Sequence, residues 1–305
     1  MSKSRLVMSV IFSALLLGAM VTVSEAAGSD SRAFINTNGT DAGNCTSGDP
    51  CRTITYALTQ LANNGEIVIQ NSGGYGAATI SQGVTISAEG IHAAITATTG
   101  SGLTVDAPGD VVTIRGLTII GQQSATSVDG VTVTSVGTLY LQCLTIEGFH
   151  NDGVNMEGGS LFFQDSDVRK CANDGLQVSG SGTNAYVHNT NFSFNTNAGV
   201  EADQGTSVTV AAGASNHNGT GFLSNASSSN SLVLLNDHAI GNTTGLATTG
   251  TGSMITFDHM LITQNTTGIN AGAGTTVTGT NPGTSLNANN GTQLVGSLQA
   301  GFVLD

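Results

Sequence analysis

The 305-residue sequence predicts an all-β solenoid, a parallel β-helix with three short strands in each coil. Three observations predict it. A glycine followed by an apolar residue returns every 22 to 24 residues, apolar and polar side chains alternate after it, and no helical period separates the strands. Such a period is typical of stacked units that bury their apolar faces only against neighbours. The repeated pairs are Gly130-Val131, Gly153-Val154, Gly175-Leu176, Gly199-Val200, Gly221-Phe222, Gly245-Leu246 and Gly268-Ile269.

Each repeat contains three strand-like segments. In the first, apolar residues such as Val154 and Met156 flank a polar residue, Asn155. This period of two is typical of a strand with one buried face. A second segment repeats the pattern, as Leu161 and Phe163 show, and a shorter third one follows. Leucine-rich repeats have a similar period, but the sequence lacks their leucine and asparagine skeleton.

The turn before each repeat glycine is rich in asparagine. Asparagine tolerates the left-handed conformation and bonds to nearby backbone, so it suits a tight bend. Because stacked coils lie about 4.8 Å apart, these side chains are expected to form a ladder. Its members would be Asn151, Asn173, Asn197, Asn218, Asn242 and Asn265.

The composition limits the function classes. Charged residues make up 9% of the chain and hydrophobic residues 39%, a balance that argues against disorder. The net charge is −13 with seven Lys and Arg residues, which argues against nucleic-acid binding because that depends on basic contacts to phosphates. One mature domain is expected.

Residues 1–26 are predicted to be a secretory signal peptide. Two basic residues precede an apolar run over 6–23, and Ser24 and Ala26 provide the small residues of a cleavage site. A membrane anchor is the alternative, since the run is about long enough to span a bilayer. No membrane span is expected in the mature chain, which would be secreted, periplasmic or attached to the cell surface.

Residues 27–65 are predicted to form an N-terminal cap ahead of a β-helix domain at 66–305. Cys45 and Cys51 flank a short polar loop and are expected to form a disulfide in an oxidising compartment. Apolar residues at 54, 57, 58 and 61 then follow helical spacing. This helix would cover the open end of the stack, which otherwise exposes the core and strand edges. The apolar residues between 294 and 304 fit a last coil, a lid or a partner contact.

The segment FINTNGTDAGNCTSGDPCRTITYAL (34–58), with GEIVI (65–69), YGAATI (75–80) and VTISAEG (84–90), resembles exported bacterial right-handed parallel β-helix proteins of the pectin-lyase-like superfamily. With the repeats, the resemblance extends over nearly the whole mature chain. It implies a right-handed β-helix with an N-terminal capping helix. It implies no single activity, because the superfamily includes lyases, hydrolases, epimerases and adhesins.

The resemblance also implies a place to look for catalysis, because pectate lyases hold Ca²⁺ with acidic residues on neighbouring coils and use a basic residue to abstract a proton. Asp129, Asp152 and Asp174 each precede a repeat glycine and would form a column of oxygen ligands. The alternative is bend chemistry, since Asp-Gly is a common turn pair. Arg169 and Lys170 are the candidate bases, with a solvated surface pair as the alternative.

Two function hypotheses follow. We favour a secreted, non-catalytic rod that binds a polysaccharide or cell-surface glycan, since the chain is rich in Thr, Ser and Asn and poor in charge. The alternative is a calcium-dependent polysaccharide lyase or a glycoside hydrolase acting on an acidic polysaccharide. Hydrolysis needs two carboxylates about 5–10 Å apart, which Asp165 and Asp167 would supply, but the paired-Asp, His-Gly and Arg-x-Lys elements of polygalacturonases are missing.

Overall fold

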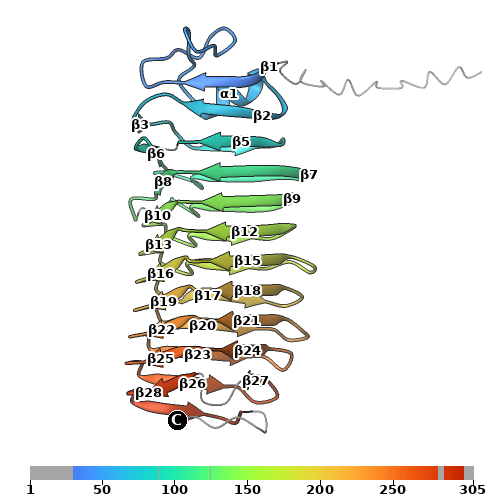
Figure 1. Cartoon of the computed structure of the whole chain (residues 1–305), viewed down its shortest axis with the longest axis vertical. Helices are drawn as coiled ribbons and strands as arrows, with labels where there is room; N and C mark the ends of the chain where they lie inside the picture. Colours follow the sequence, from blue (N-terminus) through green and yellow to red (C-terminus); the bar gives the residue numbers. More distant parts are fainter. Residues whose placement is uncertain (1–29, 89, 124, 281–284, 299–305) are drawn as a thin grey trace, which may run out of the picture.

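The chain forms a tall parallel β-helix with a cap at its N-terminal end (Figure 1). A computed structural model describes residues 30–298, apart from residues 89, 124 and 281–284. The predicted signal peptide at 1–26 and the last apolar residues, 302–304, lie outside the described residues. No helix within these described ranges is long and apolar enough to cross a membrane.

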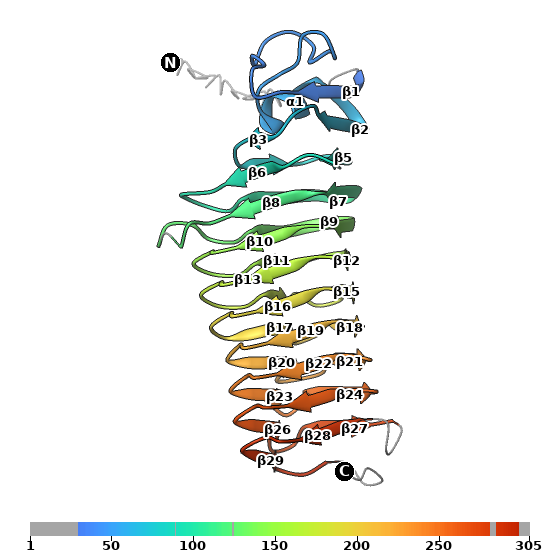
Figure 2. The same cartoon turned by 60° about the vertical axis from the view of Figure 1, so that its left-hand side comes forward.

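Each regular coil contains three strands, as the sequence predicts, and the coils stack in register (Figure 2). The first strands are β11 (Val154–Met156), β14 (Leu176–Val178), β17 (Ala198–Asp203), β20 (Thr220–Asn225), β23 (Thr244–Thr249), β26 (Thr267–Ala271) and β29 (Thr292–Val295). The second strands are β12 (Ser160–Gln164), β15 (Asn184–His188), β18 (Ser207–Ala211), β21 (Ser231–Leu235), β24 (Met254–Asp258) and β27 (Thr276–Gly279). The third strands form a separate sheet with β3 (Gly73–Gly74) and β6 (Ala93–Thr96). They are β8 (Leu117–Ile120), β10 (Thr145–Glu147), β13 (Asp167–Arg169), β16 (Asn191–Ser193), β19 (Ala214–Asn216), β22 (His238–Ile240), β25 (Leu261–Thr263) and β28 (Leu286–Ala288).

The first coils are less regular. Strands β7 (Leu103–Arg115) and β9 (Val131–Gln142) run continuously through the first and second strand positions. In an earlier coil these two positions are occupied by separate strands, β4 (Ala78–Ile80) and β5 (Val84–Ser87). They pair with the first and the last part of β7, respectively. Strand β1 (Asp30–Ile35) pairs with β2 (Leu61–Ile69), so the sheet already begins inside the segment assigned to the cap.

The repeat glycines stack in one column, and each is followed by a side chain in the core. A Cβ atom on Gly153 would lie 2.6 Å from the carbonyl oxygen of Gly175, and one on Gly245 would lie 2.6 Å from that of Gly268. Glycine is therefore required by the close approach of one coil to the next. The apolar residues that follow are fully buried and lie at equivalent positions: Val131, Val154, Leu176, Val200, Phe222, Leu246 and Ile269.

The asparagines of the turn form two columns rather than the predicted single ladder. Asn151, Asn173 and Asn197 lie on the partly exposed side of the turn. A second, buried column runs from Asn195 through later coils, where each side-chain oxygen accepts the backbone N–H of the preceding member. The split has a simple cause: three residues separate Asn195 from Gly199, but only two separate the next member from its glycine. The column consists of the buried residues Asn195, Asn218, Asn242 and Asn265 and ends at Asn290, which is half-buried.

From β10 to β28, the corner after each third strand is made by one residue with positive φ. Lys170, Phe194, His217 and Gln264 all occupy this corner position with φ of 58°. Equivalent positions elsewhere use glycine or asparagine, which adopt this conformation readily. Lys170, Phe194 and His217 are exposed there, so this edge of the rod displays their side chains.

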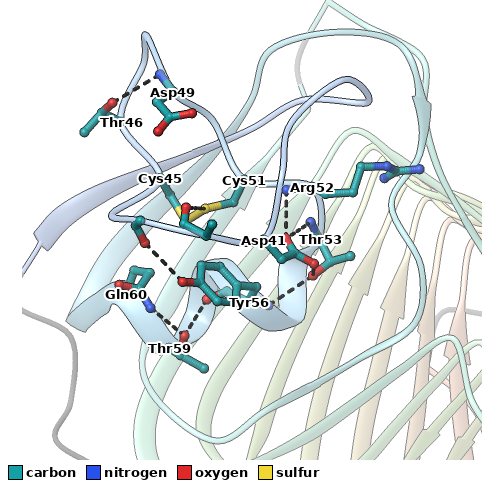
Figure 3. Close-up of a disulfide and its surroundings, with 12 residues drawn as sticks. Asp41, Cys45, Thr46, Asp49, Cys51, Arg52, Thr53, Tyr56, Thr59 and Gln60 are labelled. Carbon is teal, nitrogen blue, oxygen red and sulfur yellow. Dashed lines mark hydrogen bonds between the residues drawn. A yellow bond between two sulfur atoms is a disulfide. The ribbon is translucent and has the colours of Figure 1, made fainter.

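The predicted cap is present. Helix α1 (Ile54–Gln60) begins after Thr53, whose hydroxyl accepts the N–H of Tyr56 at 3.1 Å, and its buried residues Ile54, Ala57 and Leu58 face the first coil. The predicted helix ends slightly earlier than expected, because Leu61 starts β2. Cys45 and Cys51 form the expected disulfide, with Cα atoms 4.8 Å apart, above the helix (Figure 3). Cys143 and Cys171 are free thiols.

Candidate functional site

The three predicted acidic residues stack in one column at the turn before the repeat glycine. The Oδ1 atom of Asp152 accepts the backbone N–H of Asp174 at 2.9 Å and the Nδ2 of Asn173 at 2.8 Å. Asp174 bonds in the same way to Ala198 N at 2.7 Å and Asn197 Nδ2 at 2.8 Å. The predicted carboxylate column is therefore present, and each carboxylate ties its coil to the next.

Burial makes these carboxylates unusual. Asp129 is 1% exposed, and Asp152 and Asp174 are fully buried. Burial raises the pKa of Asp152 to about 6, and the nearby charge of Asp129 adds to the shift. Burial, followed by the charge of Glu201, raises the pKa of Asp174 well above its usual range. Low-dielectric surroundings favour the neutral acid.

Two further acidic residues, which the sequence analysis did not single out, lie beside the column on β17. Glu201 is 5% exposed and accepts hydrogen bonds from Asn197 at 3.1 Å and Asn225 at 2.9 Å. Asp203 accepts one from Gln177 at 3.3 Å. Burial and the charge of Glu201 raise the pKa of Asp203. The sequence signal that could have identified Glu201 and Asp203 is their spacing. They lie two residues apart on one strand and therefore on the same face of the sheet, outside the turn before the repeat glycine.

These contacts do not suit a calcium site. Ca²⁺ is bound by six to eight oxygen ligands, whereas the oxygens of the acidic column already accept hydrogen bonds from backbone and asparagine donors. Within the described part of the chain, no group of three His, Cys, Asp or Glu side chains is placed to hold a metal ion. The geometry of Asp129, Asp152 and Asp174 is that of a structural turn.

Arg169 is held by acidic neighbours on the outer face of the third-strand sheet. Its guanidinium donates to Glu147 at 2.8 Å and also to Asp167. The hydrogen bond that Arg169 donates to Glu147 raises the pKa of the guanidinium, which opposes a role as proton acceptor. In the part of the chain that the structure describes, no hydrogen bond or ion pair links Arg169 or Lys170 to the acidic column.

Lys170 instead lies in a hollow that we call the corner groove. It consists of a cavity of about 300 Å³ and another of about 280 Å³, which share Lys170 and Gln123. Phe194 and His150 also line the larger cavity, and Glu147 lines the smaller one. None of the three column aspartates lines either cavity.

The groove has an aromatic border. Phe194 is 57% exposed, and its ring stacks on the imidazole of His217, with centroids 5.1 Å apart and planes at 17°. Large apolar side chains with this exposure are common at binding surfaces when polar groups surround them. The groove therefore combines an exposed ring with Lys170 and polar side chains.

Lys170 differs from the other basic residues that the structure describes, because its side chain has no ion pair or hydrogen bond there, while its backbone N–H donates to the Ser193 carbonyl at 3.1 Å. Arg32 pairs with Glu66 at 2.8 Å, and the Arg52 side chain donates to the Gly74 carbonyl. Arg115 donates to Ser87. An ammonium group without a partner in an acidic protein is available to an anionic ligand.

Residues 129–290, more than half of the chain, match the family described as right handed beta helix region. The chain belongs to this family. The right-handed β-helix is similar to the crystal structure of pectate lyase Pel9A, with a TM-score of 0.51 and 14% sequence identity over 88% of this chain and 75% of that chain. At this identity the likeness shows the fold alone.

Two other solved structures resemble this right-handed β-helix less well. The Azotobacter vinelandii mannuronan C-5 epimerase AlgE6 A-module has a TM-score of 0.38 at 15% identity, covering 76% of this chain and 86% of that one. The Dettilon tailspike protein (gp208) has a TM-score of 0.40 at 11% identity, covering 81% and 68%. No curated protein sequence matched the chain.

Proposed function

We propose that this right-handed β-helix is an exported, non-catalytic rod that binds an acidic glycan in the corner groove. The supporting observation is the unpaired ammonium group of Lys170, in the lining of two neighbouring cavities, beside the exposed ring of Phe194. Export would use the signal peptide predicted at residues 1–26. The site has the size and mixed chemistry of a small-ligand pocket.

Each groove residue has a role in this proposal. The ammonium group of Lys170 pairs with a carboxylate or sulfate of the glycan. The ring of Phe194, held by its stacking on His217, packs against the C–H face of a sugar. The amides of Gln122 and Gln123 bond to hydroxyl groups. Because the whole protein has a net charge of −13, it would hold an acidic chain only where the local potential is positive.

Among the described residues, the lining of the groove contains one carboxylate and not the pair that hydrolysis requires. Glu147 is the acidic residue that lines it, and Arg169 holds this carboxylate at 2.8 Å. Asp165 and Asp167 are the other possible pair of catalytic carboxylates. Asp165 accepts a hydrogen bond from Asn189, and Asp167 forms an ion pair with Arg169. These contacts favour binding over catalysis.

The test is glycan binding by matched variants. Gln264 occupies the same corner position with the same φ of 58°, so Lys170→Gln and Phe194→Gln introduce a residue that this corner accepts. Each substitution should weaken binding of acidic polysaccharides at least about tenfold, equivalent to about 1.4 kcal/mol, measured by calorimetry. The Lys170 variant should lose its preference over carboxyl-reduced polysaccharides. Gln264→Ala is the control.

Unchanged binding in both variants would refute the proposal. The same polysaccharides, incubated with and without calcium, also test the lyase alternative. Calcium-dependent release of unsaturated uronate that disappears in Asp152→Ala would establish catalysis in place of simple binding.

A further inference from the structure

Three aromatic side chains form a row on the outer face of the second strands. Tyr140, Phe162 and Tyr186 occupy one register position on β9, β12 and β15. The rings of Tyr140 and Phe162 are stacked at 5.1 Å with planes at 16°, and Phe162 and Tyr186 lie 6.3 Å apart at 56°. Figure 2 shows these neighbouring strands stacked along the rod.

A hollow of about 280 Å³, here called the aromatic trough, runs beside this row. Phe162, Tyr186 and Thr209 form one side. The floor is the neighbouring register column, which consists of small polar residues: Thr138, Ser160, Asn184 and Ser207. No charged side chain lines the trough. It shares no residue with the corner groove.

The fold does not demand aromatic residues here. In other coils the same register position is occupied by Thr113, Thr209, Val233 and Thr256. The phenol groups of Tyr140 and Tyr186 have no hydrogen-bond partner within the described ranges. A buried phenol group usually has a hydrogen-bond partner. Tyr140 is only half-buried and Tyr186 is exposed, so their phenol groups are free to bond to a ligand.

We infer that the aromatic trough is a second glycan site, which takes an uncharged, linear polysaccharide lying along the rod axis. The rings offer apolar surface to the C–H faces of sugars, and the hydroxyl and amide groups of the floor match sugar hydroxyls. The absence of charge in the lining favours a neutral ligand. Since four coils contribute at about 4.8 Å spacing, the trough extends roughly 14 Å, enough for several sugar rings.

This inference goes beyond the proposed function, because its residues and its ligand class differ from those of the corner groove. Its rival is a purely structural role, since stacked cross-strand rings stabilise sheets by about 0.5–1.5 kcal/mol per pair. The two roles separate when binding and stability are measured on the same variants.

The experiment titrates neutral gluco-, xylo-, manno- and galacto-hexasaccharides into the exported protein. The chain has four tyrosines and no tryptophan, so tyrosine fluorescence and calorimetry both report on the site. Tyr186→Thr copies Thr209 of the adjacent coil, and Phe162→Thr introduces the residue that Thr113 and Thr209 provide at this register position in other coils. Each should weaken binding of the preferred oligosaccharide at least about tenfold, whereas Val233→Thr, in the same column, should not.

Lys170→Gln should leave this binding unchanged, so failure of the corner groove and failure of the trough are distinguishable. If none of the neutral hexasaccharides binds, the inference is wrong. It is equally wrong if the two aromatic variants lower the melting temperature but bind as the wild type does, which would leave the row a structural device.

Discussion

Two groups of coils build the turn before the repeat glycine from different residues. In the acidic coils (residues 129–198), three residues separate an inward side chain, Phe149, Cys171 or Asn195, from the repeat glycine, and Asp152 and Asp174 directly precede two of these glycines. In the asparagine coils (residues 218–290), the connection is one residue shorter and the inward position is occupied by a buried asparagine. Both arrangements satisfy backbone N–H groups that would otherwise be buried without a partner.

The difference lies in charge. Asn242 both accepts the N–H of Asn218 at 2.8 Å and donates to the carbonyl of Ser215 at 2.9 Å, so the ladder is neutral and self-sufficient. Asp152 only accepts when ionised and depends on Asn151 and Asn173 for donors. The acidic coils therefore store buried titratable groups, and they also contain most of the corner groove and the aromatic row. The asparagine coils extend the rod without such groups in this turn.

The largest predicted effect is common to both groups. Gly153→Ala and Gly245→Ala each place a methyl group 2.6 Å from the next glycine's carbonyl oxygen, and that backbone cannot move without opening the stack. Each should lower stability by about 3 kcal/mol, measured as the shift in the urea midpoint by circular dichroism. Gly48→Ala, which meets nothing within 4 Å, is the control. A large effect in one group alone would show that the two groups do not share a backbone scaffold.

The glycine column, the three strands and the capping helix were predictable because each leaves a periodic pattern. The close approach at Gly153 permits no side chain, and the alternation of Val154 and Met156 follows from a two-sided strand. The asparagine ladder was predicted in the wrong register. A one-residue difference in the turn shifts Asn218 relative to Asn197, and counting from the glycine cannot reveal which position faces the core.

The second prediction exchanges one turn chemistry for the other. Asn242→Asp removes the donor to the Ser215 carbonyl and places a carboxylate beside the side-chain oxygen of Asn265. We expect a loss of about 2 kcal/mol at pH 8, and a smaller one at pH 4, where the new acid is protonated. Asn289→Asp, at an exposed corner of the same coils, should have little effect. Equal losses at both positions would mean that burial is not the cause.

The candidate site was less predictable than the fold. The sequence correctly placed Asp129, Asp152 and Asp174 in one column, but not their burial, because Asn173 and its equivalents cover them only once the coils stack. Phe194 and Lys170 share a corner only through strand register, and no motif along the chain links them.

The third prediction concerns pH and has the smallest effect. The folded-state pKa values of Asp152, at about 6, and of Asp174 lie above their unfolded values. At a pH between the unfolded and the folded pKa of each acid, the native state binds more protons than the unfolded state. Stability should therefore be greatest near pH 4 and fall as the pH rises through 6 and beyond.

Asp174→Asn keeps an oxygen that can accept the Ala198 N–H and removes a buried acid beside Glu201 that must take up a proton on folding when the pH is above its unfolded pKa. It should therefore raise stability by about 1 kcal/mol at pH 8, leave it nearly unchanged at pH 4, and flatten the pH profile of the melting temperature. Asp237, whose pKa burial raises to about 7, remains in the variant, so part of the slope should persist. Asp165→Asn is the exposed control. If Asp174→Asn instead destabilises the protein equally at both pH values, the acid contributes through its hydrogen bonds and not through its charge.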